Sequence, residues 1–233
     1  MYRYRLCFSK NKDMKYISHL DLQRTFNRAL RRASVPVAFS QGFNPQPRLV
    51  FASPLAVGIE GINEYFDLYL DSHWNEGVLK QVLQEQLPEG LEIKAALPVD
   101  PLAAPLSALV EAAFYVAFFP VFSEGQEFIF TNILEAGEII VSRKVKKGSK
   151  EVDIRPFIYH LETKRDRDNI RLFMLLATGS TGGARPEEVL SLFPGKKETA
   201  ELFRENIFIR YGEALITPGG ETYDDYLLKL RRS

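Results

Sequence analysis

Residues 18–55 read SHLDLQRTFNRALRRASVPVAFSQGFNPQPRLVFASPL, and this stretch organises the first half of the chain. Ser18 followed by Asp21 is typical of a helix start, because a serine hydroxyl accepts a hydrogen bond from an unpaired amide of the first turn. At helical spacing, one face of the predicted helix 19–33 is apolar and is suited to pack on a sheet. That face contains Leu22, Phe26, Ala29, Leu30 and Ala33.

The opposite face of this helix carries the arginines. We call it the arginine face, and it consists of Arg24, Arg28, Arg31 and Arg32. Asp21 is the one acid within the helix, so ion pairs one turn apart do not account for four arginines. Planar guanidinium groups at this spacing suit a phosphate backbone. A solvated face, or one paired with the acidic segment downstream, is the alternative.

A loop rich in glycine, asparagine and proline follows the helix. Pro36 is expected to end the helix, Gly42 permits a positive φ, and Pro45 and Pro47 favour extended backbone. The sequence predicts a stiff loop whose ring, amides and arginine contact an unstacked nucleotide. The residues concerned are Gln41, Phe43, Asn44, Gln46 and Arg48. A structural turn with Phe43 in the core is the alternative.

The order of strand and helix patterns predicts an α+β chain. Alternating and helical patterns over residues 2–96 follow the order β-α-β-β-α-β, which is the split βαβ order of a ferredoxin-like fold. We therefore expect tandem ferredoxin-like units. The first covers 1–97, a proline-rich linker covers 98–109, and the second covers 110–233 with an extra hairpin strand and a C-terminal tail. Expected helices include 74–87, with Val78, Val82 and Leu83 inward, and 124–136.

Charge is unevenly distributed along a chain of zero net charge. Residues 1–50 hold ten Lys/Arg against two Asp/Glu, whereas residues 51–141 hold two against fourteen. A local nucleic-acid site is therefore compatible with the neutral total. The one cysteine, Cys7, excludes a disulfide within the chain, and no apolar run is long enough to span a membrane. We expect a cytoplasmic protein that does not enter the membrane.

A second basic segment and a glycine-rich turn lie in the second half. The hairpin SRKVKKGSK at 142–150, with Arg155 just beyond it, is a second candidate for RNA binding. Its cations are Arg143, Lys144, Lys146, Lys147 and Lys150. There are alternatives to RNA binding. Exposed lysines in a hairpin often only increase solubility or protect a sheet edge, and Arg155 can pair with Asp153. Arg185, before Pro186 at a predicted helix start, is a candidate anion ligand, with a plain tight turn as the alternative.

Catalytic patterns are sparse. Three histidines lie far apart and lack the spacing of metal ligands, so we expect no metal and no cofactor. A single cysteine cannot supply the three-cysteine iron–sulfur motif of radical SAM enzymes, so the chain is not itself expected to be such an enzyme. His19, in the first turn of the arginine helix, is a weak candidate for acid–base chemistry on RNA. A histidine that only makes local hydrogen bonds there is the alternative.

Several motifs resemble the radical-SAM-linked protein family, a bacterial family of unknown function found beside or fused to cobalamin-binding radical SAM proteins. The resemblance spans most of the chain and implies a radical SAM partner. The motifs are YRLxFSK at 4–10, ISHLDL at 17–22, RALRRA at 28–33, PVAFSQGFNP at 36–45, FASPL at 51–55, KEVDIRPFI at 150–158 and ARPEEVL at 184–190.

Three functional hypotheses follow. The first is a non-catalytic RNA-binding accessory protein that presents structured RNA, rRNA or tRNA, to a separate radical SAM enzyme for modification or processing. The second is a protein-interaction module that docks on that enzyme without RNA. The third is a small metal-independent endoribonuclease that uses His19. Binding without catalysis is favoured by the residues above.

Overall fold

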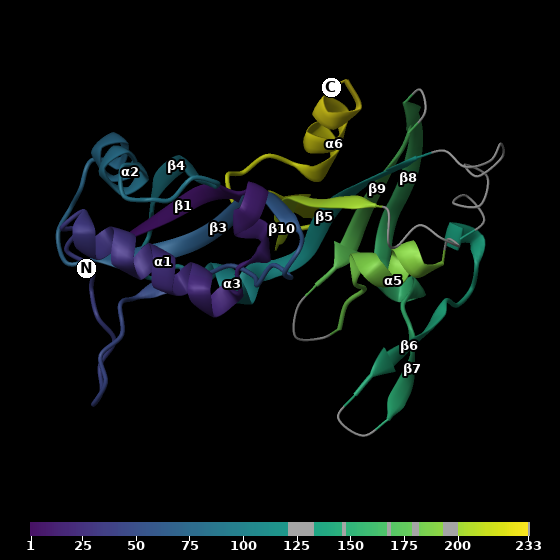
Figure 1. Cartoon of the computed structure of the whole chain (residues 1–233), viewed down its shortest axis with the longest axis horizontal. Coiled ribbons are helices and arrows are strands. Elements are labelled where there is room, and N and C mark those ends of the chain that lie inside the picture. Colours follow the sequence, from purple (N-terminus) through teal and green to yellow (C-terminus); the bar gives the residue numbers. More distant parts are fainter. Residues whose placement is uncertain (121–132, 146–147, 167–168, 179–181, 193–199, 233) are drawn as a thin grey trace. The chain divides into compact units, whose positions relative to one another are not determined.

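The computed structural model describes residues 1–120, 133–145, 148–166, 169–178, 182–192 and 200–232 (Figure 1). These residues form helices and mostly antiparallel strands, which confirms the expected α+β class. The chain divides into two compact units. Unit 1 comprises Met1–Val110 and Ile209–Ser233, and unit 2 comprises Glu111–Phe208.

Unit 1 follows the order β-α-β-β-α-β and then receives the C-terminal elements. Its elements are β1 (Tyr2–Lys10), the 3-10 helix η1 (Lys12–Tyr16), α1 (His19–Arg32), β2 (Leu49–Phe51), β3 (Glu60–Leu70), α2 (Glu76–Gln84), β4 (Leu91–Val99), α3 (Leu106–Leu109), the end of β10 (Glu201–Tyr211), β11 (Ala214–Ile216) and α6 (Tyr223–Arg232).

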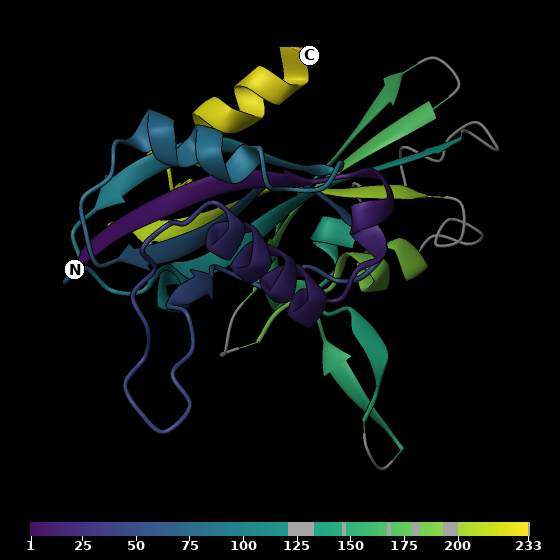
Figure 2. The same cartoon turned by 60° about the vertical axis from the view of Figure 1, so that its left-hand side comes forward.

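The sheet of unit 1 places β1 between β4 and β3, and β2 also pairs with β3, each pair being antiparallel. Alternate residues of β1 face the helices, because side chains alternate across a strand. Tyr4, Leu6 and Phe8 are buried there in one core with apolar side chains of α1 and α2. Figure 2 shows both helices running alongside these strands.

The other face of this sheet carries a buried ionic cluster. Asp67 of β3 binds Arg3 at 2.5 Å and Arg5 at 3.0 Å, both from the neighbouring strand β1. Arg3 also donates to the carbonyl oxygens of Ala103 (2.6 Å) and Ala104 (2.9 Å). These bonds fix much of the expected linker, 98–109, to unit 1.

The C-terminal segment differs from the expected division. It was assigned to the second unit, whereas residues 209–233 cluster with unit 1. Strand β11 pairs with the end of β10, and the side-chain amide of Asn63 donates to the hydroxyl of Tyr226 in α6 at 3.3 Å. Such pairing between residues far apart in the sequence leaves no local signal.

Helix α2 is shorter than the expected 74–87, and its inward face is set one residue later. Asn75 caps its start by accepting the amide hydrogen of Val78. Leu79 and Leu83 are buried, whereas the side chain of Val78 is 49% exposed. The expectation that Val78 faces inward was therefore wrong.

Unit 2 contains a sheet and a separate hairpin. Its elements are β5 (Val110–Pro120), β6 (Ile140–Lys144), β7 (Ser149–Asp153), the 3-10 helix η2 (Arg155–Phe157), β8 (Ile158–Asp166), β9 (Asn169–Ala177), α5 (Pro186–Ser191) and the first part of β10. The sheet order is β10-β5-β9-β8, while β6 and β7 pair with each other. The expected helix 124–136 lies mostly outside the described residues.

Candidate nucleic-acid interface

Helix α1 begins and faces the core as the sequence predicts. The hydroxyl of Ser18 accepts the amide hydrogen of Asp21 at 3.2 Å, which caps the helix. The predicted inward residues Leu22, Phe26 and Leu30 are buried. All members of the arginine face are exposed, as the helical periodicity requires.

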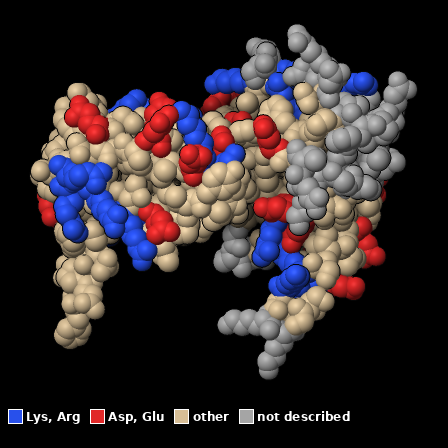
Figure 3. Space-filling view, in the orientation of Figure 1, with Lys and Arg blue, Asp and Glu red and all other residues tan. Residues whose placement is uncertain are grey.

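The four arginines differ in what they contact. Arg24 pairs with Asp21 at 3.1 Å, and Arg32 donates to the side chain and the backbone of Gln86. Arg28 and Arg31 make no hydrogen bond or ion pair with any residue that the structure describes. Figure 3 shows basic side chains gathered over this part of unit 1. The charge of Arg28 also helps to lower the pKa of the Asp21 carboxyl. Among the described residues, Arg28 and Arg31 are therefore the two guanidinium groups of α1 without a hydrogen bond or ion pair, and their donors are able to bind an anion.

The acid at the start of α1 is held ionised. The hydroxyl of Ser18, and then the guanidinium of Arg24, lower the pKa of the Asp21 carboxyl. Both partners stabilise the charged form of the acid. Arg24 is therefore paired with a carboxylate at neutral pH. A phosphate would have to compete with this carboxylate, so Arg24 is a poorer phosphate ligand than Arg28 or Arg31.

The end of α1 directs the chain into the loop. Ser34 adopts φ of 53°, a left-handed conformation, and its amide donates to Arg31 while the amide of Val35 donates to Leu30. This pattern is a Schellman motif, which ends a helix and satisfies its last carbonyl groups. The helix therefore ends before Pro36, which had been expected to end it.

The loop that follows is closed at its base. The amide of Ser40 donates to the carbonyl oxygen of Gln46 at 2.8 Å, and the amide of Gln46 donates to the hydroxyl of Ser40 at 2.9 Å. An isolated antiparallel β-bridge also pairs Phe39 with Pro47. Figures 1 and 2 both show this 40–47 loop standing off the body of unit 1.

The tip of the 40–47 loop presents its side chains to solvent. Phe43 has a relative exposure of 107%, so the alternative that places this ring in the core is wrong. Gln41, Asn44 and Gln46 are also exposed. Gly42 has φ of 134°, a conformation that favours glycine and explains its place beside Phe43.

Arg48 has a structural contact that the sequence did not reveal. Its guanidinium lies over the ring of Tyr69, 4.0 Å from the centroid, and a guanidinium nitrogen lies 2.8 Å from the sulfur of Met1. Such a cation–π contact holds the side chain against β3. Arg48 therefore supports the base of the loop, in contrast to the predicted contact with a nucleotide.

His19 packs beside the core. Its ring lies edge-on to Phe51, with the ring centroids 5.1 Å apart. The described residues contain no group of three or more His, Cys, Asp or Glu side chains arranged to hold a metal ion.

In unit 2, the basic hairpin is anchored by one of its own arginines. The guanidinium of Arg143 binds Glu188 through two hydrogen bonds of 2.6 and 2.7 Å and donates to the carbonyl oxygen of Gly183. This use within the protein removes Arg143 from the candidate interface. Lys144 and Lys150 are exposed, whereas Lys146 and Lys147 lie outside the described residues.

Arg155 is also committed to backbone groups. It donates two hydrogen bonds to the carbonyl oxygen of Leu134, at 2.7 and 3.2 Å, and one to that of Ile158. Asp153 accepts the backbone amides of Ile139 and Arg155, which lower the pKa of its carboxyl. The expected role of Arg155 in RNA binding therefore has no geometric support.

The start of α5 already holds a carboxylate. The side chain of Glu188 accepts the backbone amide of Arg185 at 2.9 Å, and the same carboxylate binds Arg143. Burial opposes ionisation of Glu188, but these donors lower the pKa of its carboxyl overall. The anion predicted at Arg185 is thus supplied by the chain itself, since a capping glutamate satisfies the helix start.

Comparison with known sequences places the chain in a family. Residues 3–186 match a family described as an uncharacterized protein conserved in bacteria, DUF2344. The chain belongs to this family. The matched residues include α1, the 40–47 loop and the β6–β7 hairpin. No curated protein matches the sequence significantly.

Two solved structures align at low similarity. A chain in the crystal structure of a Cbf5-Nop10-Gar1 complex aligns with a TM-score of 0.49 and 10% identity, over 88% of this chain and 48% of that one. An unknown protein from Galdieria sulphuraria aligns with a TM-score of 0.27 and 16% identity, over 86% of this chain and 95% of that one. This chain thus spans about half the length of the first. Neither alignment carries an argument about function.

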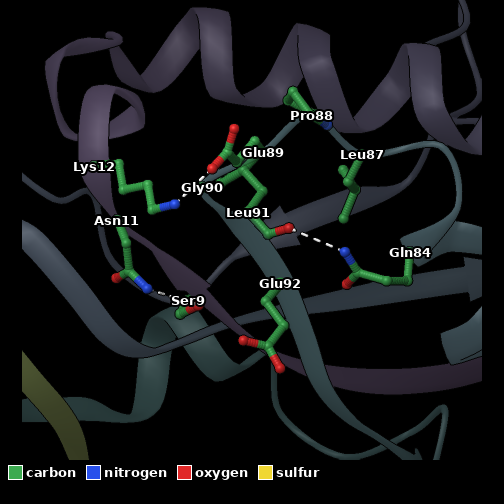
Figure 4. A pocket seen from close by; sticks show the side chains of 10 residues that line it. All are labelled: Ser9, Asn11, Lys12, Gln84, Leu87, Pro88, Glu89, Gly90, Leu91 and Glu92. Atoms are coloured by element: carbon green, nitrogen blue, oxygen red, sulfur yellow. Dashed lines mark hydrogen bonds and ion pairs between the residues drawn. The ribbon is translucent and has the colours of Figure 1, made fainter.

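A polar pocket of ≈ 370 Å³ lies in unit 1, between η1 and the connection from α2 to β4 (Figure 4). Gln84 bonds to the backbone of β4 through both ends of its amide, and Lys12 pairs with Glu89 at 2.5 Å. Asn11 donates to Ser9, and its amide oxygen is buried without a partner among the described residues. Most polar groups here hold elements together, so we assign the pocket a structural role.

The ionic cluster of Arg3, Arg5 and Asp67 has no recognisable signal in the sequence. The alternation YRYR at 2–5 places both arginines on one face of β1, but strand patterns do not identify the acid across the sheet. Within the described ranges, every helix is too short or too polar to cross a bilayer.

Proposed function

We propose that this protein binds structured RNA through the arginine face of α1 and the 40–47 loop. The observation that carries the proposal is the pair Arg28 and Arg31, which are exposed and make no hydrogen bond or ion pair among the described residues. A guanidinium binds a phosphate through directional, charge-assisted hydrogen bonds, which are stronger than hydrogen bonds between neutral groups. The loop that follows α1 adds an exposed ring and amides without any charged residue from 40 to 47.

The proposed role is that of an accessory protein. We infer that the protein presents rRNA or tRNA in the cytoplasm to a separate radical SAM enzyme, which carries out the modification or processing. The support for the partner is the resemblance of the sequence motifs described above.

The finer fold assignment is part of this proposal. We propose that each unit is ferredoxin-like, with a hairpin added to the second. The order β4-β1-β3-β2 in unit 1 and the order β10-β5-β9-β8 in unit 2 support it, because a split βαβ unit places its first and third strands centrally.

The test compares two double variants in binding to a fluorescently labelled structured RNA. We expect Arg28→Ala with Arg31→Ala to weaken binding at least about tenfold, since a hydrogen bond to a charged group contributes roughly 1.5–3 kcal/mol. The control is Lys12→Ala with Lys80→Ala, which removes the same charge from exposed positions outside α1 and the loop. We expect little change in this control.

Three results would contradict the proposal. Equal loss in both double variants would mean that binding reflects only total charge. A stable complex with a protein partner that forms without RNA, and that Arg28→Glu abolishes, would support the protein-docking hypothesis. RNA cleavage that His19→Ala abolishes would instead support the endoribonuclease hypothesis.

A further inference from the structure

The base of the 40–47 loop is held by several contacts, which make the loop a rigid support for the residues at its tip. Two hydrogen bonds between Ser40 and Gln46 close it, and a third joins the amide of Arg48 to the carbonyl oxygen of Ala38 at 2.8 Å. The stacking of Arg48 on Tyr69 fixes the same end to β3. A ring presented on such a closed loop loses little conformational freedom when it binds.

The chemistry of the tip differs from that of α1. Phe43 is fully exposed, and single exposed apolar residues are common on protein surfaces. Here, however, three side-chain amides accompany the ring, from Gln41, Asn44 and Gln46. None of these amides makes a hydrogen bond to the residues that the structure describes. The loop thus offers one stacking face together with donors and acceptors, and it carries no cation.

The cations lie on the element just before the loop. Arg28 and Arg31 are on the exposed side of α1, and only a few residues separate this helix from the loop base. Phosphate contacts position a protein on RNA, whereas base contacts select the site. Unit 1 therefore separates the two kinds of contact between neighbouring elements.

We propose that the 40–47 loop binds an unpaired nucleobase of the RNA held by α1. Phe43 stacks on the base, and an amide of Asn44 or Gln46 bonds to its edge. A base inside a duplex is covered on both faces, so the ligand is a loop, bulge or end of a folded RNA. This inference rests on the RNA-binding function proposed above and names the part of the RNA that is selected.

The experiment measures selectivity with two labelled RNAs of equal length and charge. One is a hairpin with an unpaired loop, and the other is a fully paired duplex. Wild-type protein is expected to prefer the hairpin. Phe43→Ala is expected to reduce the ratio of hairpin to duplex affinity by about 5- to 150-fold, which is the usual effect of losing one aromatic stack on a base.

Two further substitutions separate stacking from general apolar contact. Phe43→Trp is expected to retain the preference, because its larger ring also stacks, whereas Phe43→Leu is expected to lose it. The exposure of Phe43 means that none of these substitutions removes a core contact. Circular dichroism of each variant checks that the fold is unchanged.

The outcomes distinguish this inference from the proposed function. If Arg28→Ala with Arg31→Ala weakens both RNAs but Phe43→Ala leaves the ratio unchanged, the base-binding inference is overturned and RNA binding stands. If wild-type protein binds neither RNA, both proposals fail. If Phe43→Ala disrupts only a complex with a protein, the loop is a protein-docking element and the inference is overturned.

Discussion

Asp67 is important for the stability of unit 1, because its buried carboxylate neutralises two buried arginines. Both Asp67 and Arg3 are nearly inaccessible to solvent, and the segment that contains Ala103 and Ala104 is bonded to Arg3. Breaking a buried ion pair from one side leaves a charge that water does not reach. The cluster therefore ties the start of the chain to the connection that leaves unit 1.

We predict that Asp67→Asn destabilises the protein by about 3–5 kcal/mol, which is the usual cost of leaving a buried charge unpaired. Urea denaturation followed by circular dichroism measures the change. Asp71→Asn, at an exposed position just after the end of β3, is the control and is expected to change stability by less than about 0.5 kcal/mol. Equal effects of the two substitutions would refute the role given to Asp67.

Ser34 holds the left-handed position at the end of α1. A residue with a side chain is strained there, whereas glycine is not. We predict that Ser34→Gly stabilises the protein by about 0.5–1 kcal/mol. Thermal unfolding monitored by calorimetry tests this, and a lower melting temperature would contradict it.

For individual arginines, the sequence predicted exposure to solvent better than it predicted which side chains they contact. Helical periodicity placed Arg28 and Arg31 on the outer face of α1, and the structure agrees. The partners of Arg48 and Arg143 lie 21 and 45 residues away in the sequence, at Tyr69 and Glu188. Periodicity carries no information about contacts across that separation.

At the scale of elements, the β6–β7 hairpin depends on the carboxylate of Glu188. This group bonds both to Arg143 of the hairpin and to the backbone at the start of α5. Its pKa is lowered in the folded protein. Its stabilising contribution is therefore present above the unfolded pKa of about 4.3 and is lost as the pH falls through the lower folded pKa.

We predict that the hairpin loses protection below about pH 4 because Glu188 becomes protonated there. Amide hydrogen exchange, expressed as protection factors, measures this for residues of β6 and β7. Glu188→Gln is expected to reduce the protection at neutral pH as well. Glu187→Gln changes the neighbouring carboxylate, which makes no bond to Arg143, and is expected to leave the protection unchanged. Identical behaviour of the two variants would show that the anchor is misassigned.

Element types were easier to predict than their ends and faces. Helix α1 was predicted at 19–33 and observed at His19–Arg32, because Ser18 and the arginine periodicity are local signals. Helix α2 has a weaker pattern, since a valine and a leucine are adjacent at 78–79 and again at 82–83, and either residue of each pair could face inward. Its packing is decided by Leu79 and Leu83 against the sheet, which the local pattern does not determine.

At the scale of the whole molecule, the neutral net charge conceals the basic start of the chain. Each phosphate contact contributes about 0.7–0.9 to the slope of log affinity against log salt concentration. We predict that removing Arg28 and Arg31 together lowers the magnitude of this slope by about 1.4–1.8. Titrations of one RNA at several salt concentrations measure it, and an unchanged slope would show that these arginines do not contact phosphates.

The overall division of the chain was only partly accessible from sequence. The proline-rich stretch near 100 marked the approach to unit 2, which begins at Glu111. The return of residues 209–233 to unit 1 was missed, because β10 begins in one unit and ends in the other. A strand that serves two units has the same alternating pattern as any other strand.

The central claim is that α1 and the 40–47 loop together bind RNA. The most direct measurement is to crosslink the protein to RNA with ultraviolet light in cells, purify it, and map the crosslinked residues by mass spectrometry. If α1 and the 40–47 loop bind RNA together, we expect discrete RNA species, with crosslinks at or beside Phe43 and within α1. Protein that is free of RNA even when purified at low salt, or crosslinks confined to unit 2, would contradict it.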